Sequence, residues 1–332
     1  MTFKTYILFR LLTCILTIWI GVTVIFFVPR MFPSDPVENM IAQVRSLQGS
    51  MHPEEIESMR RTLQVQFGLD GSLWEQYVNY LSRGLLRFDF GPSLMNFPTP
   101  VSEIILRQLP YTLFLSLFTT ILAWIIGNLI GMRAGFRKNE KSAKFMEAVA
   151  ICIYPIPYFI VALVLQIVFA FLLGWFPLQA NIMFHGGFWM WFSSLIMASV
   201  LPAVSMLLIG TGWWIISMKA LSSTTSEEDF VLYARYRGLT EKEIGKNYVW
   251  RNSIITQVTA LALGLGGIFS GAILTEIIFG YPGVGSLIQR AIMLSDFNMI
   301  LGTITISIVA ISVSTFLVDI IYPFIDPRVR YK

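Results

Sequence analysis

The sequence offers few side chains that could perform covalent chemistry or hold a metal. Its histidines are His52 and His185, and its cysteines are Cys14 and Cys152. Each is isolated from other metal-ligating side chains, and both cysteines lie within apolar runs, where a thiol is typical of packing. The pattern His-Glu-x-x-His, paired acids in an apolar segment and a Ser–Lys/His arrangement are all missing, which argues against a membrane-embedded protease. We therefore predict no catalytic residue, no metal site and no cofactor in this chain.

The glycine-rich segment 280–285 (GYPGVG) does not have the pattern of a phosphate-binding loop. It lacks the Lys-Ser/Thr pair that contacts phosphate and magnesium, and no such pattern occurs elsewhere in the sequence. Any ATP would therefore be hydrolysed by another chain. The glycines and the proline predict a turn that follows an apolar run and directs the chain back into the protein.

Glu276 is an acid within an apolar stretch, which makes it a candidate functional residue. It follows Asn252 by 24 residues, or about 36 Å of helix, so it is expected near the far end of a membrane span. Two interpretations remain open. Glu276 either belongs to a gate or pathway, for which Tyr281 and Gly283 are further candidates, or it is a solvated acid at a helix end.

The composition identifies the environment of these residues. Apolar residues make up 55% of the 332 and charged residues only 13%, against roughly 25% charged in soluble domains. This excludes a cytosolic enzyme, a disordered chain and an ordinary nucleic-acid-binding protein. Six apolar runs are long enough to cross a bilayer as helices. They are Ile7–Val28, Tyr111–Met132, Val149–Leu173, Leu195–Ile216, Ile254–Ile278 and Ile300–Ile325.

The positive charges orient these runs. If the N-terminus is cytoplasmic, all eight lysines and eight of the 16 arginines lie on the cytoplasmic side. Seven of the other arginines lie in or beside one long outer loop, which counts little in the positive-inside rule. We predict that both termini are cytoplasmic.

Two connections are too long to be simple turns. Residues 31–110, outside the membrane, contain helical patterns at Pro53–Gln66 and Leu73–Leu86 and are expected to form a small folded cap. Residues 219–252 form a cytoplasmic loop. The whole chain, 1–332, is predicted to be a single transmembrane domain.

The cytoplasmic loop carries the sharpest local signals. Ser226 followed by Asp229 predicts a capped helix start, and Gly238 predicts its end in the left-handed conformation. Thr240-Glu241-Lys242-Glu243 is a capping box, so a second helix should run from there to about Asn252.

This pair of helices has two open interpretations. Phe230, Val231 and Ala234 share one side of the first helix, with a spacing suited to docking into a groove. Alternatively, the basic residues of the loop would suit an amphipathic segment on the lipid surface.

Several motifs resemble one known family along nearly the whole chain. In the loop they are Glu228-Asp229-Phe230-Val231, Ala234-Arg235, Gly238-Leu239 and Arg251-Asn252. Elsewhere they are Pro33-Ser34-Asp35-Pro36, Asp89-Phe90-Gly91-Pro92-Ser93-Leu94, Leu173-Gly174-Trp175-Phe176-Pro177, Leu274-Thr275-Glu276, Tyr281-Pro282-Gly283-Val284-Gly285, Leu317-Val318-Asp319 and Asp326-Pro327-Arg328. Together they resemble the permease subunits of ABC importers, specifically the dipeptide/oligopeptide/nickel subfamily.

The resemblance implies an all-α integral membrane permease with six transmembrane helices, an outer cap and a cytoplasmic loop that docks on an ATPase. It assigns ATPase coupling to Glu228, Asp229, Phe230, Ala234, Gly238, Arg251 and Asn252. The implied partners are a second homologous permease, two ATP-binding subunits that hold ATP and magnesium, an extracytoplasmic substrate-binding protein and the lipid of a bacterial or archaeal cell membrane. Nucleic acid is not an expected partner.

The substrate is less closely defined by the sequence. Among the substrates of this subfamily we place oligopeptides first and oligosaccharides second, and nickel last because the spans contain no cluster of His or Met ligands. A stand-alone channel or secondary transporter is the alternative of another class. Such a protein would lack a docking loop and would usually show an inverted repeat or several intramembrane charges.

Overall fold

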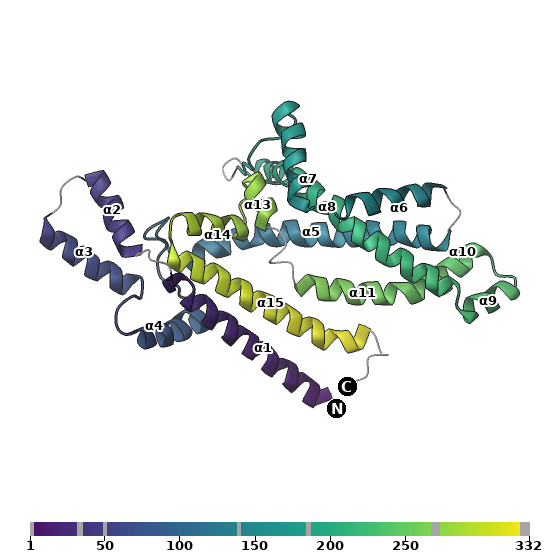
Figure 1. The fold of residues 1–332 in the computed structure, drawn as a ribbon, viewed down its shortest axis with the longest axis horizontal. Helices are drawn as coiled ribbons and strands as arrows, with labels where there is room; N and C mark the ends of the chain where they lie inside the picture. The colour runs from purple at the N-terminus through teal and green to yellow at the C-terminus, as the bar shows by residue number, and fades with distance from the viewer. Residues whose placement is uncertain are drawn as a thin grey trace. The chain divides into compact units, whose positions relative to one another are not determined.

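This computed structural model describes residues 3–31, 36–48, 52–137, 141–183, 187–266 and 273–325. Two of the family-like motifs, at 33–35 and 326–328, and His185 lie outside the described residues. The described residues are helical apart from turns, short connections and an isolated bridge between Pro92 and Pro100. The helices (Figure 1) are α1 (Phe3–Phe27), η1 (Pro29–Met31), α2 (Pro36–Gln48), α3 (Pro53–Gln66), α4 (Leu73–Asn79), η2 (Tyr80–Leu85), α5 (Val101–Phe136), α6 (Lys141–Ile153), α7 (Tyr158–Leu165), η3 (Gln166–Leu172), α8 (Phe188–Ser226), α9 (Asp229–Tyr236), α10 (Glu241–Ile244), η4 (Gly245–Trp250), α11 (Arg251–Gly266), α13 (Ile273–Phe279), α14 (Val284–Met293) and α15 (Phe297–Ile325). The predicted all-α fold is confirmed.

Four described helices are long and apolar enough to cross a membrane. They correspond to the first, second, fourth and sixth predicted runs and extend over Lys4–Phe27, Val101–Phe136, Phe188–Ser226 and Phe297–Ile321. The helices over Val101–Phe136 and Phe188–Ser226 are 36 and 39 residues long, well beyond the roughly 20 residues that a bilayer core requires. These helices therefore continue past the hydrocarbon region at one or both ends.

The third and fifth predicted runs do not form single straight helices in the described residues. The third is divided into Lys141–Ile153 and Tyr158–Leu172, which are bent by 98°. Pro155 and Pro157 lie in the break, where each removes a backbone donor and restricts the residue before it. The fifth run is described as α11 and α13, and residues 267–272 between them are outside the described part. The count of six spans stays a prediction.

The chain divides into two compact units. Unit 1 consists of Met1–Leu8, Leu113–Tyr281 and Ser314–Lys332, and unit 2 of Phe9–Thr112 and Pro282–Val313.

Unit 1 packs α6, α7 and α11 against the long helix α8, and the C-terminal half of α5 packs there too. Three glycines spaced by four residues form the contact surface of α5. A Cβ on Gly131 would lie 2.5 Å from the carbonyl oxygen of Ile215, and one on Gly127 would lie 2.3 Å from Cβ of Trp214. Gly135 is similarly close to Ser222 and Lys219. Small residues on one face thus allow the two backbones to approach closely, as in many membrane helix pairs.

Unit 2 contains the predicted cap. Its helix α3 has the predicted bounds, and the second predicted helix appears as α4 followed by the wider turns of η2. Helix α2 was not predicted, although its buried Val37 and Ile41 pack with Leu63 and Phe67 of the α3 region. Helices α1 and α15 lie side by side in this unit (Figure 1), where a Cβ on Gly21 would lie 3.1 Å from the Ile308 side chain.

A buried aspartate joins the cap to the last span within unit 2. Asp296 is fully buried and caps α15, because its Oδ1 accepts the backbone N–H of Met299 at 3.1 Å. Its Oδ2 accepts the hydroxyl of Ser93 at 2.6 Å and the backbone N–H of Met95 at 3.0 Å. One carboxylate therefore satisfies three buried donors and fixes the segment before α5 against the start of α15.

Candidate functional site

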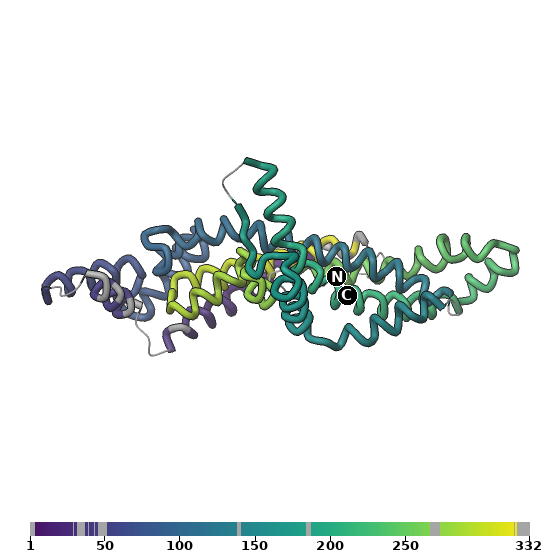
Figure 2. Tube along the Cα trace, turned by 90° about the horizontal axis from the view of Figure 1, so that it is seen from above, coloured from purple at the N-terminus to yellow at the C-terminus, as the bar shows by residue number. Residues whose placement is uncertain are grey.

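The short helix α9 of unit 1 and the helix that begins at α10 are joined by a tight turn, in the green part of the tube in Figure 2. Gly238 has φ of +80°, as predicted for the end of a helix. Its N–H donates to the Arg235 carbonyl at 2.9 Å, and the Leu239 N–H donates to the Ala234 carbonyl at 3.3 Å. These two bonds satisfy carbonyls that the end of α9 leaves free, so the turn is a Schellman motif.

The predicted start of the first helix was wrong. Ser226 is the last residue of α8, and its hydroxyl donates to the Ser223 carbonyl at 2.7 Å. The Thr224 hydroxyl bonds back to the Ala220 carbonyl in the same way, so the Ser226 hydroxyl is used within α8 and caps no following helix. Glu228, with extended backbone angles, precedes α9, and its side chain makes no capping bond.

The second helix begins as predicted but does not end as predicted. The hydroxyl of Thr240 accepts the Glu243 N–H at 3.3 Å, and the Glu243 carboxylate accepts the Thr240 N–H at 2.9 Å. The Thr240 hydroxyl also donates to Oε2 of Glu243 at 2.7 Å. This bond, and to a lesser extent the bond from the Thr240 N–H, lowers the pKa of the Glu243 carboxyl. The helix then continues through Asn252 to Gly266, because no glycine turn or proline interrupts it there. The second helix of the predicted loop and the first part of the fifth apolar run are therefore one continuous helix.

The family-like residues at the join have different environments. Arg251, the first residue of α11, is exposed. Asn252 is half-buried, and its Nδ2 donates to the Tyr248 carbonyl one turn earlier at 2.7 Å. In the turn itself, Arg235 and Glu241 form an ion pair at 3.1 Å that joins the two helices. Glu228 and Asp229 at the start of α9 are both exposed.

The prediction that Phe230, Val231 and Ala234 share a docking side was wrong for two of the three. Val231 and Ala234 are 0% and 2% exposed, and they pack with Ile244 and Val249 of the second helix. Met132 and Phe136 of α5 cover the same cluster. The small apolar face of α9 is therefore used inside the chain. Its solvent-facing side is aromatic: Phe230 is 39% exposed, Tyr233 69% and Tyr236 77%.

Glu276 lies in α13 and is fully buried, so its interpretation as a solvated acid at a helix end is wrong. The helix ends four residues later at Gly280, with φ of +60°, in a second Schellman turn. There the Tyr281 N–H donates to the Glu276 carbonyl at 2.8 Å. The fully buried Tyr281 also shares a hydrogen bond between its hydroxyl and that of Ser199 in α8, at 3.1 Å. The predicted turn at 280–285 is confirmed.

Gly283, the third gate candidate, belongs to unit 2, where it is buried and precedes α14. The next N–H, that of Val284, donates to the hydroxyl of Thr112 at 2.8 Å.

Sequence reasoning missed the exposed tyrosines of α9 and the buried carboxylate of Asp296. An acid directly before the apolar run of α15 is a capping signal that could have identified Asp296. No pattern in the sequence distinguishes the outward Tyr233 from the inward Val231, since both are apolar or aromatic residues of one short helix. In the described residues, no group of three or more His, Cys, Asp or Glu is placed to hold a metal.

Comparison with known proteins agrees with this architecture. A dipeptide transport system permease protein of Lactococcus lactis is 28% identical over 98% of this chain and 99% of its own length. An oligopeptide transport system permease protein of Bacillus subtilis is also 28% identical, and one of Haemophilus influenzae is 27% identical, with the same coverage. Residues 127–331 match the family described as "Binding-protein-dependent transport system inner membrane component". This match covers more than half of the sequence, and the chain therefore belongs to that family of inner membrane transport components.

Proposed function

We propose that this chain is the permease subunit of an ATP-driven importer that takes up oligopeptides delivered by an extracytoplasmic binding protein. As a member of its family the chain is a multi-pass membrane component, and ATP hydrolysis belongs to partner subunits. The peptide assignment is supported by the relatives, whose names are those of dipeptide and oligopeptide permeases. Oligosaccharides are the second candidate substrate.

The observation that carries the coupling role is the helix pair α9–α10 with its aromatic outer side. The pair is rigidly built, because a capping box, a Schellman turn and a buried apolar cluster fix it to the end of α5. Phe230 and the outward tyrosines then remain available for a partner. We assign ATPase docking to this surface. Ala234 acts in internal packing and does not contact the partner in this proposal.

We assign a different role in ATPase coupling to each of the other family-like residues of the loop. Glu228 and Asp229 are exposed acids at the start of α9, where they complement the helix dipole and can meet basic groups of the ATPase. Gly238 provides the turn between the helices. Arg251 and Asn252 stand where the loop continues into a span, so movement of the docked loop is transmitted directly along α11.

The gate is assigned to the segment around α13. A fully buried acid in an apolar span is costly and is typical of a functional site in a membrane protein. Glu276 and Tyr281 lie one Schellman turn apart and are both fully buried. Gly283 begins the turn into α14. A change at this turn would alter the outer end of the span.

The proposed assembly contains a second homologous permease and two ATP-binding subunits, with both termini of this chain cytoplasmic in a bacterial inner membrane. The orientation is tested by labelling single cysteines from outside sealed cells, after Cys14 and Cys152 are replaced. A cysteine at Arg60 should react and one at Thr240 should not. The reverse pattern would overturn the orientation.

Uptake by the reconstituted system tests the substrate. Proteoliposomes that contain both permeases, the ATPase subunits and the cognate binding protein should accumulate labelled trialanine when supplied with internal ATP. Maltotriose, of similar length, should not enter. Accumulation of maltotriose without trialanine would replace the peptide proposal with the oligosaccharide alternative.

A pair of substitutions on α9 tests the coupling surface. Tyr233→Ala removes an exposed ring, so it should leave the thermal stability of the permease unchanged and reduce co-purification of the ATPase subunits. Val231→Ala creates a cavity in the buried cluster, so it should lower thermal stability. Normal co-purification and normal ATP-driven uptake in Tyr233→Ala would contradict docking on this side.

A further inference from the structure

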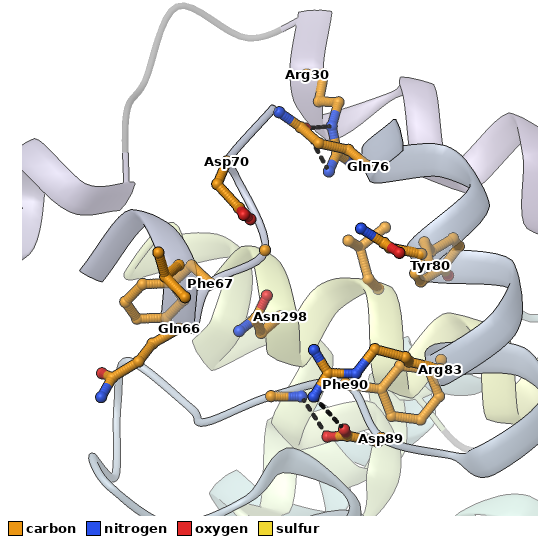
Figure 3. Close-up of a pocket in the computed structure, with 16 residues that line it drawn as sticks. Arg30, Gln66, Phe67, Asp70, Gln76, Tyr80, Arg83, Asp89, Phe90 and Asn298 are labelled. Atoms are coloured by element: carbon orange, nitrogen blue, oxygen red, sulfur yellow. Dashed lines mark hydrogen bonds and ion pairs between the residues drawn. The ribbon is translucent and has the colours of Figure 1, made fainter. Parts of the chain in front are cut away.

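The cap of unit 2 contains a cavity of about 200 Å³ (Figure 3). Its walls come from the segment after α1, the end of α3, helices α4 and η2, and the start of α15. Arg30 and Gln76 lie at one end and the Arg83–Asp89 ion pair, at 3.0 Å, at the other, with Tyr80 and Asn298 between them. The walls are therefore polar and carry both signs of charge.

Arg30 is held rigidly at its end of this cavity. Its guanidinium carbon lies 3.6 Å from the centroid of the Phe26 ring, and Nη1 donates to the Phe26 carbonyl at 2.8 Å. Nε and Nη2 both donate to Oε1 of Gln76 at 3.3 Å. Gln76 is itself fixed, because its Nε2 donates to the Leu69 carbonyl at 3.0 Å and the Gly71 carbonyl at 3.3 Å.

Among the described residues, these bonds leave part of the guanidinium without a partner. An arginine has five N–H groups, and three of those on Arg30 have partners. Each terminal nitrogen, Nη1 and Nη2, keeps one N–H that these bonds do not use and that can donate to an anion. The position of the guanidinium is thus fixed before any ligand arrives, which reduces the entropy lost on binding.

Within the described part of the chain, Arg30 makes no ion pair with a carboxylate. Burial lowers the pKa of Arg30 to about 10, an effect opposed by the neighbouring Tyr80. The group still carries its proton at neutral pH. The Asp70 carboxylate also lines this cavity but forms no ion pair with Arg30 in the described residues. A partly desolvated arginine that no carboxylate pairs with binds an anion more strongly than a solvated or paired arginine does.

The other residues that line the cavity indicate which kind of molecule would carry the anionic group. Gln66, Asn79 and Asn298 present carboxamides that can pair with peptide N–H and C=O groups, and Phe90 and Leu301 are apolar. A cavity of about 200 Å³ can receive one end of a peptide but is too small for a long chain.

From this geometry we propose that the cap cavity binds the free C-terminal carboxylate end of a peptide, with Arg30 as the carboxylate-binding residue and Gln76 as the residue that positions it. This site would give the permease its own contact with substrate, apart from the binding protein. The inference rests on the proposed function, since it takes a peptide as the imported substrate.

Direct binding to the purified permease–ATPase complex in nanodiscs, without the binding protein, tests the proposal. The probes are trialanine and its C-terminal amide, which differ only in the terminal carboxylate. Wild-type complex should bind trialanine at least tenfold more tightly than trialaninamide, as expected for loss of a charge-assisted hydrogen bond. Arg30→Gln should bind both at the amide level, and Arg30→Lys should be intermediate. Arg87→Gln, at an exposed arginine of the same cap outside the cavity, should match wild type.

Equal affinity of the wild type for the acid and the amide would overturn the proposal, and so would no measurable binding of trialanine. The wild-type comparison needs no substitution, so it decides the matter even if Arg30→Gln destabilises the cap. Uptake of trialanine by the complete system distinguishes failure of the cap site from failure of the proposed peptide function. Import without binding at the cap refutes this site alone, whereas absence of import with all partners present refutes the peptide function.

Discussion

Substitution of Gly238 tests the coupling helix pair most directly. The residue has φ of +80°, and an added Cβ would meet no atom within 4 Å. Steric clash inside the chain is therefore excluded, and only the backbone conformation opposes a side chain. A left-handed conformation costs an L-residue about 1 to 2 kcal/mol, and less for asparagine, which adopts it more readily.

The three variants of Gly238 should lose coupling between ATP hydrolysis and transport to different extents. Gly238→Ala should depopulate the Schellman turn by roughly fivefold or more, since 1 kcal/mol corresponds to a factor of about 5. Gly238→Asn should lose less, and Gly238→Asp should lose the most if the turn also faces the ATPase. Aspartate adopts the left-handed conformation more readily than alanine, so a larger loss for aspartate than for alanine would not come from backbone strain and would point to the partner.

The assay is ATP hydrolysis by the reconstituted complex, stimulated by the loaded binding protein, together with co-purification of the ATPase subunits. Membrane insertion should be unchanged in all three variants, because the turn lies outside the described membrane-crossing helices. Wild-type stimulation in both Gly238→Ala and Gly238→Asp would refute the hinge and weaken the coupling assignment. A larger loss in asparagine than in alanine would refute the conformational explanation.

Other residues give independent tests. Glu276→Gln keeps the size of a fully buried side chain and removes its charge, so uptake should fall while assembly persists; uptake at the wild-type rate would contradict a gate role. Asp296→Ala removes the acceptor for three buried donors and should destabilise unit 2 by roughly 2 to 3 kcal/mol, seen as a lower melting temperature, whereas an unchanged melting temperature would contradict the capping role. Gly131→Ala places a Cβ 2.5 Å from a carbonyl oxygen of α8 and should cost about 1 to 3 kcal/mol in thermal unfolding. Gly210→Ala, whose nearest neighbour would be 3.4 Å away, is the control that should be tolerated, and equal stability of the two variants would argue against the close α5–α8 contact.

The features that the sequence predicted correctly are those set by local chemistry. Gly238 and Gly280 adopt positive φ because glycine alone has no Cβ to oppose it, and the turns need only neighbouring backbone groups. The capping box at Thr240 depends on side chains three residues apart, and the apolar runs depend on composition alone. The break at Pro155 and Pro157 has the same local origin, because proline lacks a backbone donor, whereas its angle of 98° depends on packing.

Tertiary structure decided which face of each element is used. Ser226 is a good capping residue, yet it ends α8, because a preceding helix that continues competes for the same backbone. Val231 and Ala234 have the spacing of a docking face, but α5 and the second helix cover them, and a helical period cannot tell which neighbour will do so. Glu276 was ambiguous because burial depends on elements distant in sequence. Arg30 bonds to Gln76, 46 residues away, only because the cap folds. The sequence alone therefore determined the helices and turns, whereas packing between distant segments determined the sites.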